Sequence, residues 1–184
     1  MLLEEGDVLL SWHEPGSGLK QLANRYFHRE LLRKGEQRYP WWDSSSSYLR
    51  FDHVRLCVSV DAERTLGFEF TSPAARHFVI TEDMLNWPGM RVYRHCPQPR
   101  TDRNLLVQSL RLDGTLYDLG ELVAFRLPWL HKMDFGARNR VCSTGVRVVL
   151  RDWMGEDPLD DISIPMSKTL PCDFANSDMW IRML

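Results

Sequence analysis

The segment that most constrains the fold is an alternating run of residues between positions 51 and 60. Its aliphatic residues share one face of an extended strand: Val54, Leu56, Val58 and Val60. The opposite face carries His53, Arg55, Cys57 and Ser59. A strand with one apolar face needs a partner strand and a covering layer, so the chain must contain a packed sheet.

A second alternating segment follows directly after a polar turn at residues 61–64. Leu66, Phe68 and Phe70 fall on one face of this segment, and Gly67 and Glu69 fall on the other. If the two strands pair as a hairpin, His53 and Glu69 share its polar face. The sequence does not fix the pairing register on which this depends.

Other elements are expected on both sides of this hairpin. A short buried strand is predicted at Gly6–Leu10, and further strands are predicted at Arg76–Ile80, Met90–Arg94 and Glu121–Leu127. Helical spacing predicts an amphipathic helix from Leu19 to Leu32 that ends at Gly35. A second helix is predicted to begin at Cys142 and to stop at Gly155, with an apolar stripe along one side: Cys142, Val146, Val149 and Trp153.

Composition excludes several classes of protein. The chain has 184 residues with a formal net charge of −2 and 43% hydrophobic residues, which indicates one globular domain rather than a disordered or nucleic-acid-binding chain. We expect a single domain over 1–184, with an inserted helix and a Trp/Ser loop at about 17–48. No apolar run is long enough to span a membrane, and the acidic N-terminus is unlike a signal peptide, so a cytoplasmic location is expected. The sequence does not indicate the oligomeric state.

The four cysteines are expected to be reduced thiols, and Cys142 is the one with a distinctive position. At the first turn of a helix, the helix dipole and unpaired backbone N–H groups stabilise a thiolate. A nucleophilic cysteine also needs a base and a group that orients the base, and His53 and Glu69 supply both. The alternative is that Cys142 is a small buried apolar residue and His53 a structural histidine.

Other chemical motifs are absent from the sequence. There is no Cys-x-x-Cys pair, the histidines lack the spacing of a helical metal site, and no phosphate-binding loop is present. We therefore expect no metal and no cofactor. A metal-binding protein is nevertheless kept as one hypothesis for the function, because the chain has six scattered histidines and four cysteines.

Four short motifs, in this order, resemble the circularly permuted, NlpC-like branch of the papain-fold cysteine hydrolases, which includes YiiX-type proteins. They are Gly6-Asp7-Val8-Leu9-Leu10, Asp52-His53-Val54-Arg55-Leu56, Phe68-Glu69-Phe70 and Arg140-Val141-Cys142-Ser143. Looser similarities lie at Tyr117-Asp118…Gly120 and at Thr169-Leu170-Pro171-Cys172-Asp173. The resemblance spans nearly the whole chain.

The resemblance implies a nucleophile at Cys142, a general base at His53 and an orienting residue at Glu69. Three positions depart from the family pattern. Arg55 stands where the family has glycine, and it can assist or obstruct the site or bind a substrate carboxylate. Val141 replaces a tyrosine and Thr144 replaces a glutamate, which leaves the substrate class open.

The expected fold is α+β and papain-like, with a bent antiparallel sheet or half-barrel packed against the helix that bears the nucleophile. The expected function is that of a thiol hydrolase, an amidase or peptidase that forms an acyl-enzyme with a peptide or acyl amide. The resemblance implies cell-wall peptides or lipid-like acyl chains as candidate substrates, and an acyltransferase remains open. The alternative is a non-catalytic interaction module on the same scaffold. In either case Trp41 and Trp42 are candidates for a binding edge.

Overall fold

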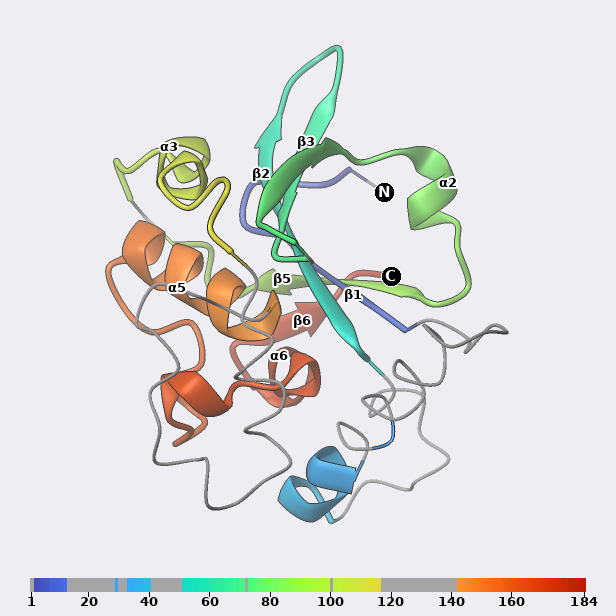
Figure 1. The fold of residues 1–184 in the computed structure, drawn as a ribbon, viewed down its shortest axis with the longest axis vertical. Helices are drawn as coiled ribbons and strands as arrows, with labels where there is room; N and C mark the ends of the chain where they lie inside the picture. Colours follow the sequence, from blue (N-terminus) through green and yellow to red (C-terminus); the bar gives the residue numbers. More distant parts are fainter. Residues whose placement is uncertain are drawn as a thin grey trace.

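A computed structural model of the chain describes residues 2–12, 29, 33–40, 51–71, 73–99, 101–116 and 142–184. Its architecture is α+β, with one antiparallel sheet and several helices (Figure 1). The predicted strand at Glu121–Leu127 and most of the predicted helix at Leu19–Leu32 lie outside the described residues.

The sheet has six strands in the order β4-β3-β2-β1-β5-β6, and every neighbouring pair is antiparallel. The strands are β1 (Val8–Ser11), β2 (His53–Val60), β3 (Thr65–Glu69), β4 (Arg76–Val79), β5 (Met90–His95) and β6 (Trp180–Arg182). The sheet is strongly twisted, so that β2 and β3 run steeply in Figure 1 while β5 runs nearly across the view.

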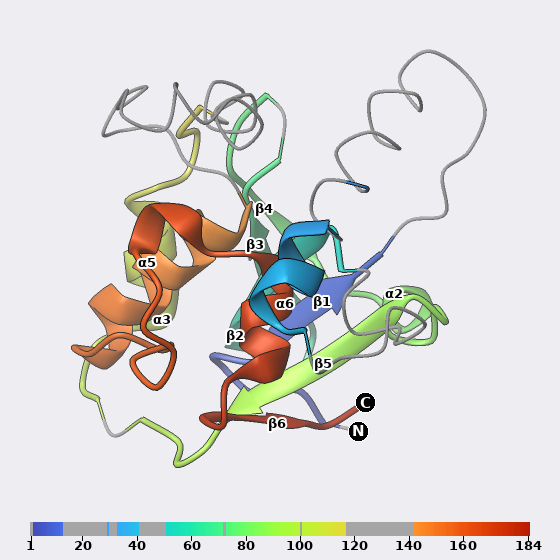
Figure 2. The same ribbon diagram turned by 90° about the horizontal axis from the view of Figure 1, so that it is seen from below.

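The helices cover both faces of the sheet. Five labelled helical elements lie within the described residues: α2 (Glu82–Leu85), α3 (Leu105–Leu110), α5 (Cys142–Met154), the 3-10 turn η3 (Met166–Lys168) and α6 (Pro171–Asn176). Residues 33–38 form a further helical segment, which has no label. In Figures 1 and 2, α3 and α5 lie together on one side of the sheet, and α2 lies on the other. The main core is built between the sheet and this α3/α5 side, and α6 contributes Phe174 to it.

The predicted hairpin is confirmed. β2 pairs with β3 so that Arg55 lies opposite Glu69 and Leu56 opposite Phe68. The apolar residues Val54, Leu56, Val58, Phe68 and Phe70 are buried in the main core. The opposite face carries a second, smaller core that includes Cys57, Leu9 and Val92.

One residue of the predicted apolar face is an exception. Val60 is exposed, because the pairing of β2 with β3 shifts by one residue between Cys57 and Ser59. Such an irregularity changes the face toward which the following residues point. The prediction for Val60 is therefore wrong, and the bulge is the reason.

Helix α5 matches its prediction closely. The stripe Cys142, Val146, Val149 and Trp153 is buried, and Gly155 follows the helix with φ +85°. Gly145 lets this helix approach the sheet, because a Cβ at that position would lie 2.3 Å from atoms of the Phe70 ring. The first turns of α5 are therefore held tightly against Phe70, the residue that follows β3.

The predicted stop at Gly35 is wrong. Residues 33–38 are helical, and the backbone N–H of Tyr39 still donates to the carbonyl of Gly35 at 2.8 Å. The helix continues past the glycine because Arg38 and Tyr39 are held at its end by Asp173 of α6. A tertiary contact has overridden the local preference of glycine.

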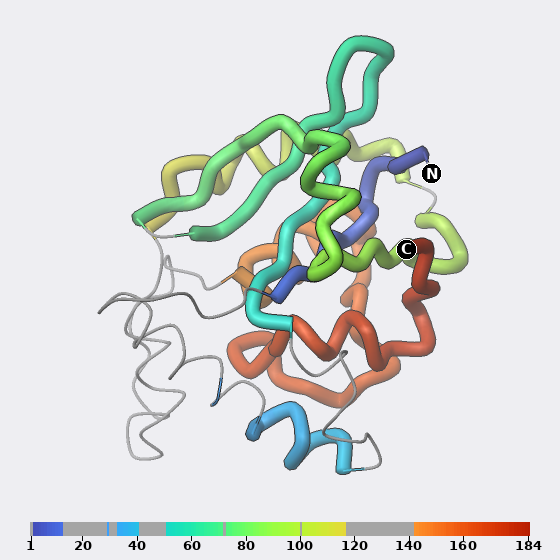
Figure 3. The backbone as a smooth tube through the Cα atoms, turned by 90° about the vertical axis from the view of Figure 1, so that its right-hand side faces the viewer, coloured from blue at the N-terminus to red at the C-terminus, as the bar shows by residue number. Residues whose placement is uncertain are grey.

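The two ends of the described chain lie close together (Figure 3). β6 pairs with β5, and the Arg94 guanidinium on β5 donates to the carbonyl of Leu2 at 3.1 Å. β1, near the beginning of the chain, and β6, near its end, both pair with β5 and therefore belong to one sheet.

Candidate active site

The candidate site lies where β2 and α5 both begin. His53 is the first residue of β2, and Cys142 is the first residue of α5. The Sγ of Cys142 lies 4.0 Å from the carbonyl oxygen of Asp52, the residue that precedes His53. The start of β2, with His53, therefore lies next to the start of α5.

His53 and Glu69 are in direct contact across the hairpin. The Nε2 of His53 lies 2.9 Å from Oε2 of Glu69, and the His53 side chain is 14% exposed. Because the strands pair in register, Glu69 lies opposite Arg55, diagonally from His53 and on the same face. The predicted sharing of one polar face by His53 and Glu69 is confirmed.

The electrostatics of His53 connect the strand to the helix. Burial of the ring would lower the pKa of His53, but hydrogen bonding to Cys142 and to Glu69 outweighs it and raises this pKa to about 9. Both other residues of the predicted triad therefore favour the charged form of His53. At neutral pH the imidazole is held in its charged form.

Glu69 is held as a carboxylate by several cations. Burial would raise its pKa, but the hydrogen bonds from His53 and Arg76 and the charge of Arg55 lower the pKa of Glu69 to about 2. Arg55 Nε donates to Oε2 at 3.0 Å, and Arg76 donates to Oε1 at 2.8 and 2.9 Å. A carboxylate that stays charged above about pH 2 can orient the His53 ring wherever that ring is charged, up to about pH 9.

The structure places the other predicted site residues as follows. Arg55 lies beside His53, and its guanidinium donates hydrogen bonds to Glu69 and to Ser11. Thr144 is buried in α5, with its Oγ1 3.5 Å from the Met166 carbonyl oxygen. Trp41, Trp42 and Val141 lie outside the described residues, so the predicted binding edge has no structural account.

Sequence analysis missed Arg76 and Ser11 as members of this site. Arg76 is the first residue of β4 and is the register partner of Glu69, and Ser11 is the register partner of His53. Both residues could have been identified if the pairing register of β1, β2, β3 and β4 had been known, since directly paired residues share one face of the sheet. The sequence alone provides no such register.

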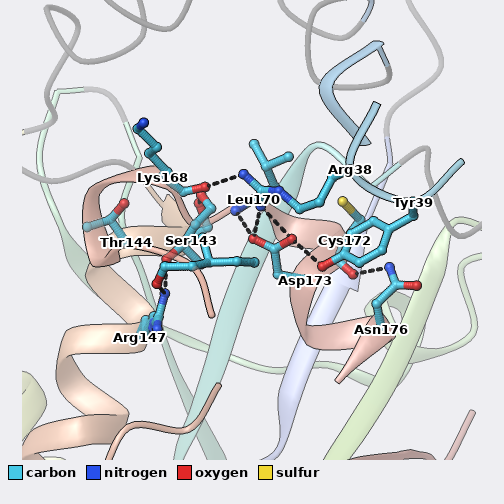
Figure 4. Close-up of polar contacts among 12 residues, drawn as sticks. Arg38, Tyr39, Ser143, Thr144, Arg147, Lys168, Leu170, Cys172, Asp173 and Asn176 are labelled. Atoms are coloured by element: carbon cyan, nitrogen blue, oxygen red, sulfur yellow. Dashed lines mark hydrogen bonds and ion pairs between the residues drawn. The ribbon is translucent and has the colours of Figure 1, made fainter. Parts of the chain in front are cut away.

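A second polar cluster, around Asp173, fixes the surroundings of the start of α5 (Figure 4). The Asp173 carboxylate is fully buried and accepts hydrogen bonds from Arg38, from the Tyr39 hydroxyl and from the backbone N–H of Leu170. Burial raises the pKa of Asp173, against the charge of Arg38. The segment before α6 is thereby tied to the helix over residues 33–38.

The same segment holds the residue that follows the candidate nucleophile. The Ser143 hydroxyl donates to the Thr169 carbonyl oxygen at 2.6 Å, and Arg147 donates to the Thr169 hydroxyl at 2.9 Å. Arg147 also forms an ion pair with Asp157 at 2.7 Å. These contacts fix the first turns of α5 from the side that does not face the sheet.

The remaining cysteines differ from Cys142 in their surroundings. Burial raises the pKa of Cys57 to about 12 and also raises the pKa of Cys172 well above its usual range. Cys96 is exposed. Cys142 is the cysteine that the described structure places beside His53.

A Ser-His-Asp arrangement also occurs between β4 and α3. The His77 Nε2 lies 2.8 Å from Oγ of Ser109, and its Nδ1 lies 3.3 Å from Oδ1 of Asp113. Ser109 is fully buried, however, and its hydroxyl donates to the Leu106 carbonyl oxygen at 2.8 Å. The arrangement therefore joins α3 to β4 and offers no accessible nucleophile.

Comparison of the chain with protein-family models, with curated proteins and with solved structures gives no match. Across the described ranges, no helix is both long and apolar enough to cross a membrane. In the same part of the chain, no three His, Cys, Asp or Glu side chains are grouped so as to hold a metal ion. The site must therefore be interpreted from its own geometry.

Proposed function

We propose that the chain is a cysteine hydrolase with a papain-like, permuted NlpC-like fold, and that it acts on an amide through an acyl-enzyme. The observation that carries the proposal is the position of His53, which lies 2.9 Å from Glu69 and directly follows Asp52, whose carbonyl oxygen is 4.0 Å from the Cys142 Sγ. A helix that begins with a cysteine and packs on an antiparallel sheet beside a strand that bears a histidine supports the fold assignment. The papain-like class and the activity both rest on this likeness.

The proposed reaction begins from a pair in which the Cys142 proton already resides on His53, a state that the raised pKa of His53 favours. Glu69 holds Nε2, which leaves Nδ1 for the thiol proton. The thiolate attacks the carbonyl carbon to form an S–C bond, and backbone N–H groups at the start of α5 stabilise the oxyanion. The C–N bond then breaks as His53 returns the proton to the leaving amine.

Deacylation restores the enzyme. Water attacks the thioester carbonyl and gives one proton to His53, the S–C bond breaks, and the carboxylic acid leaves. The thiolate and the charged imidazole are then the starting pair again. An amine or hydroxyl in place of water would make the protein an acyltransferase, with the same residues in the same roles.

The decisive experiment compares the alkylation rates of the four cysteines by iodoacetamide at pH 7, read peptide by peptide by mass spectrometry. We expect Cys142, although only 6% exposed, to react faster than the exposed Cys96, whereas the buried Cys57 and Cys172 react slowest. His53→Ala should slow alkylation of Cys142 by about 100-fold or more, since a positioned base typically contributes about 10²- to 10⁴-fold. The proposal fails if Cys142 reacts no faster than Cys96, or if His53→Ala leaves its rate unchanged.

A non-catalytic interaction module is the second candidate. The low exposure of Cys142 and the crowding of Glu69 by three cationic side chains favour it. Turnover of an acyl-amide substrate that is lost in Cys142→Ser would exclude the module. Slow, His53-independent alkylation of Cys142 would favour it.

A further inference from the structure

The carboxylate oxygen that orients His53 is shared with a second side chain of the same strand. Arg55 Nε donates to Oε2 of Glu69 at 3.0 Å, and His53 Nε2 lies 2.9 Å from that same atom. Arg76 uses only the other oxygen, Oε1. Arg55 therefore contacts the side of the carboxylate that the histidine uses, and Arg76 does not.

Arg55 is also fixed at its far end. Its Nη1 donates to the Ser11 hydroxyl at 2.7 Å, and Ser11 is fully buried in β1. The guanidinium thus spans from β3 to β1 across β2, with two N–H groups held in a rigid planar fork. A substrate-binding arginine would keep these donors for its ligand, whereas this one spends them on the protein.

We propose that Arg55 is a positioning residue that holds Oε2 of Glu69 at the place where His53 requires it, with Ser11 as its anchor. This assigns to Arg55 a role other than binding a substrate carboxylate. The proposal rests on the function proposed above, because the positioned imidazole serves Cys142. It also explains how a large cationic side chain can occupy a position next to the site without occupying the place of a substrate.

The charges around His53 give the proposal a direction. Among the described residues, His53 faces Glu69 from β3, Cys142 from α5 and Arg55 from its own strand. The charge of Arg55 lowers the pKa of His53, while Glu69 and Cys142 raise it. Loss of Arg55 would therefore raise the pKa of His53 while loosening the carboxylate that orients the ring.

The experiment compares Arg55→Gln with Arg76→Gln, because each variant removes one of the positively charged ion-pair partners of Glu69. The His53 pKa is followed by NMR of the imidazole, assigned with His53→Ala. We expect Arg55→Gln to raise this pKa by on the order of half to one unit, and Arg76→Gln to change it less, since Arg76 is 65% exposed and screened by solvent. Ser11→Ala keeps the charge and should leave the pKa nearly unchanged.

Alkylation of Cys142 separates positioning from substrate binding. Iodoacetamide is neutral and iodoacetate is anionic, so an arginine that binds substrate anions would assist only the second reagent. We expect Arg55→Gln to slow both reagents by a similar factor of about fivefold at pH 7, with Ser11→Ala slowing both by a smaller factor. Arg55→Lys keeps the charge and one donor group, and it should restore part of the rate.

The outcomes are distinct. A selective loss with iodoacetate, together with an unchanged His53 pKa, would overturn the proposal and assign Arg55 to substrate binding. Equal effects of Arg55→Gln and Arg76→Gln on the pKa and on both rates would overturn it as well. Failure of the proposed function is seen separately, in the wild-type chain, as a Cys142 that reacts no faster than Cys96 or ignores His53→Ala. The NMR titration still reports the Arg55–Glu69–His53 contact in that case.

Discussion

At the scale of single residues, the charge of Glu69 is the property on which the candidate site depends. Glu69→Gln keeps the shape of the side chain and removes the charge that raises the His53 pKa. We expect the His53 pKa to fall by about one unit or more, and alkylation of Cys142 at pH 7 to slow by about tenfold. NMR titration of the imidazole and peptide-resolved alkylation measure the two effects.

The control for this variant is Glu63→Gln, which removes the same charge from an exposed turn. It should leave both the His53 pKa and the Cys142 rate as they are in the wild type. Circular dichroism establishes that Glu69→Gln is folded, since it leaves Arg55 and Arg76 without their shared counter-charge. An unchanged His53 pKa in folded Glu69→Gln would contradict the assignment of Glu69 as the orienting residue.

The sequence predicts those parts of the site that follow from the residue pattern within a single strand or helix. Alternation along two strands places His53 and Glu69 on one face, and helical spacing places Cys142 at a helix start. The link from Arg55 to Ser11 depends on the pairing of β1 with β2, which joins residues 44 positions apart. No local pattern contains that register, so the second role of Arg55 could not be predicted.

At the scale of secondary-structure elements, the close approach of α5 to Phe70, the residue after β3, is set by Gly145. Gly145→Ala would gain up to about 1 kcal/mol of helix propensity, but its methyl group would overlap the Phe70 ring. We expect a net loss of about 1–3 kcal/mol in the free energy of unfolding, because the helix must shift away from a packed core. Urea denaturation followed by circular dichroism measures the loss.

A double-mutant cycle tests the cause of this loss. Phe70→Leu shortens the side chain that the new methyl would meet, so Gly145→Ala should cost less in the Phe70→Leu background than in the wild type. Additive effects would show that Gly145 matters for a reason other than its contact with Phe70. The Cys142 alkylation rate in each variant shows whether the displacement of α5 reaches the site.

The elements that sequence patterns predicted are those whose own periodicity decides them. α5 is 13 residues long with a continuous buried stripe, and β2 and β3 alternate. α6 and β6 were not predicted, because they span six and three residues and their burial comes from distant partners. The extension of the helix over residues 33–38 past Gly35 has the same origin, since Asp173 is 135 residues from Arg38.

At the scale of the whole molecule, the sheet draws strands from both ends of the chain around the site. β1 provides Ser11, β2 and β3 provide the polar face, and α5 provides Cys142 from the C-terminal half. The Asp173 cluster then links the helix over residues 33–38 to the segment that holds Ser143. The geometry of the site therefore depends on the complete fold. The free energy of unfolding should accordingly depend on whether the residues of the site are charged.

The stability of the fold should consequently depend on pH through His53. Its pKa is raised from an ordinary 6.5 to about 9 in the folded chain, so folding favours the charged ring. This contribution is fully present below pH 6.5 and is lost as the pH rises toward about 9, with a total of about 3 kcal/mol. Equilibrium urea unfolding between pH 6 and 9 should show a steady fall in the free energy of unfolding.

His53→Gln isolates the contribution of His53 from those of the other titrating groups. The raised pKa values of Cys57 and Cys172 also make stability fall with pH, but only from about pH 8 upward, where the unfolded thiols begin to ionise. Between pH 6.5 and 8 the variant should therefore be nearly flat while the wild type declines, and the difference between the two curves should stop changing above about pH 9. Parallel curves would mean that the folded chain does not favour the charged imidazole, and the electrostatic coupling of His53 to Glu69 and Cys142 would have to be abandoned.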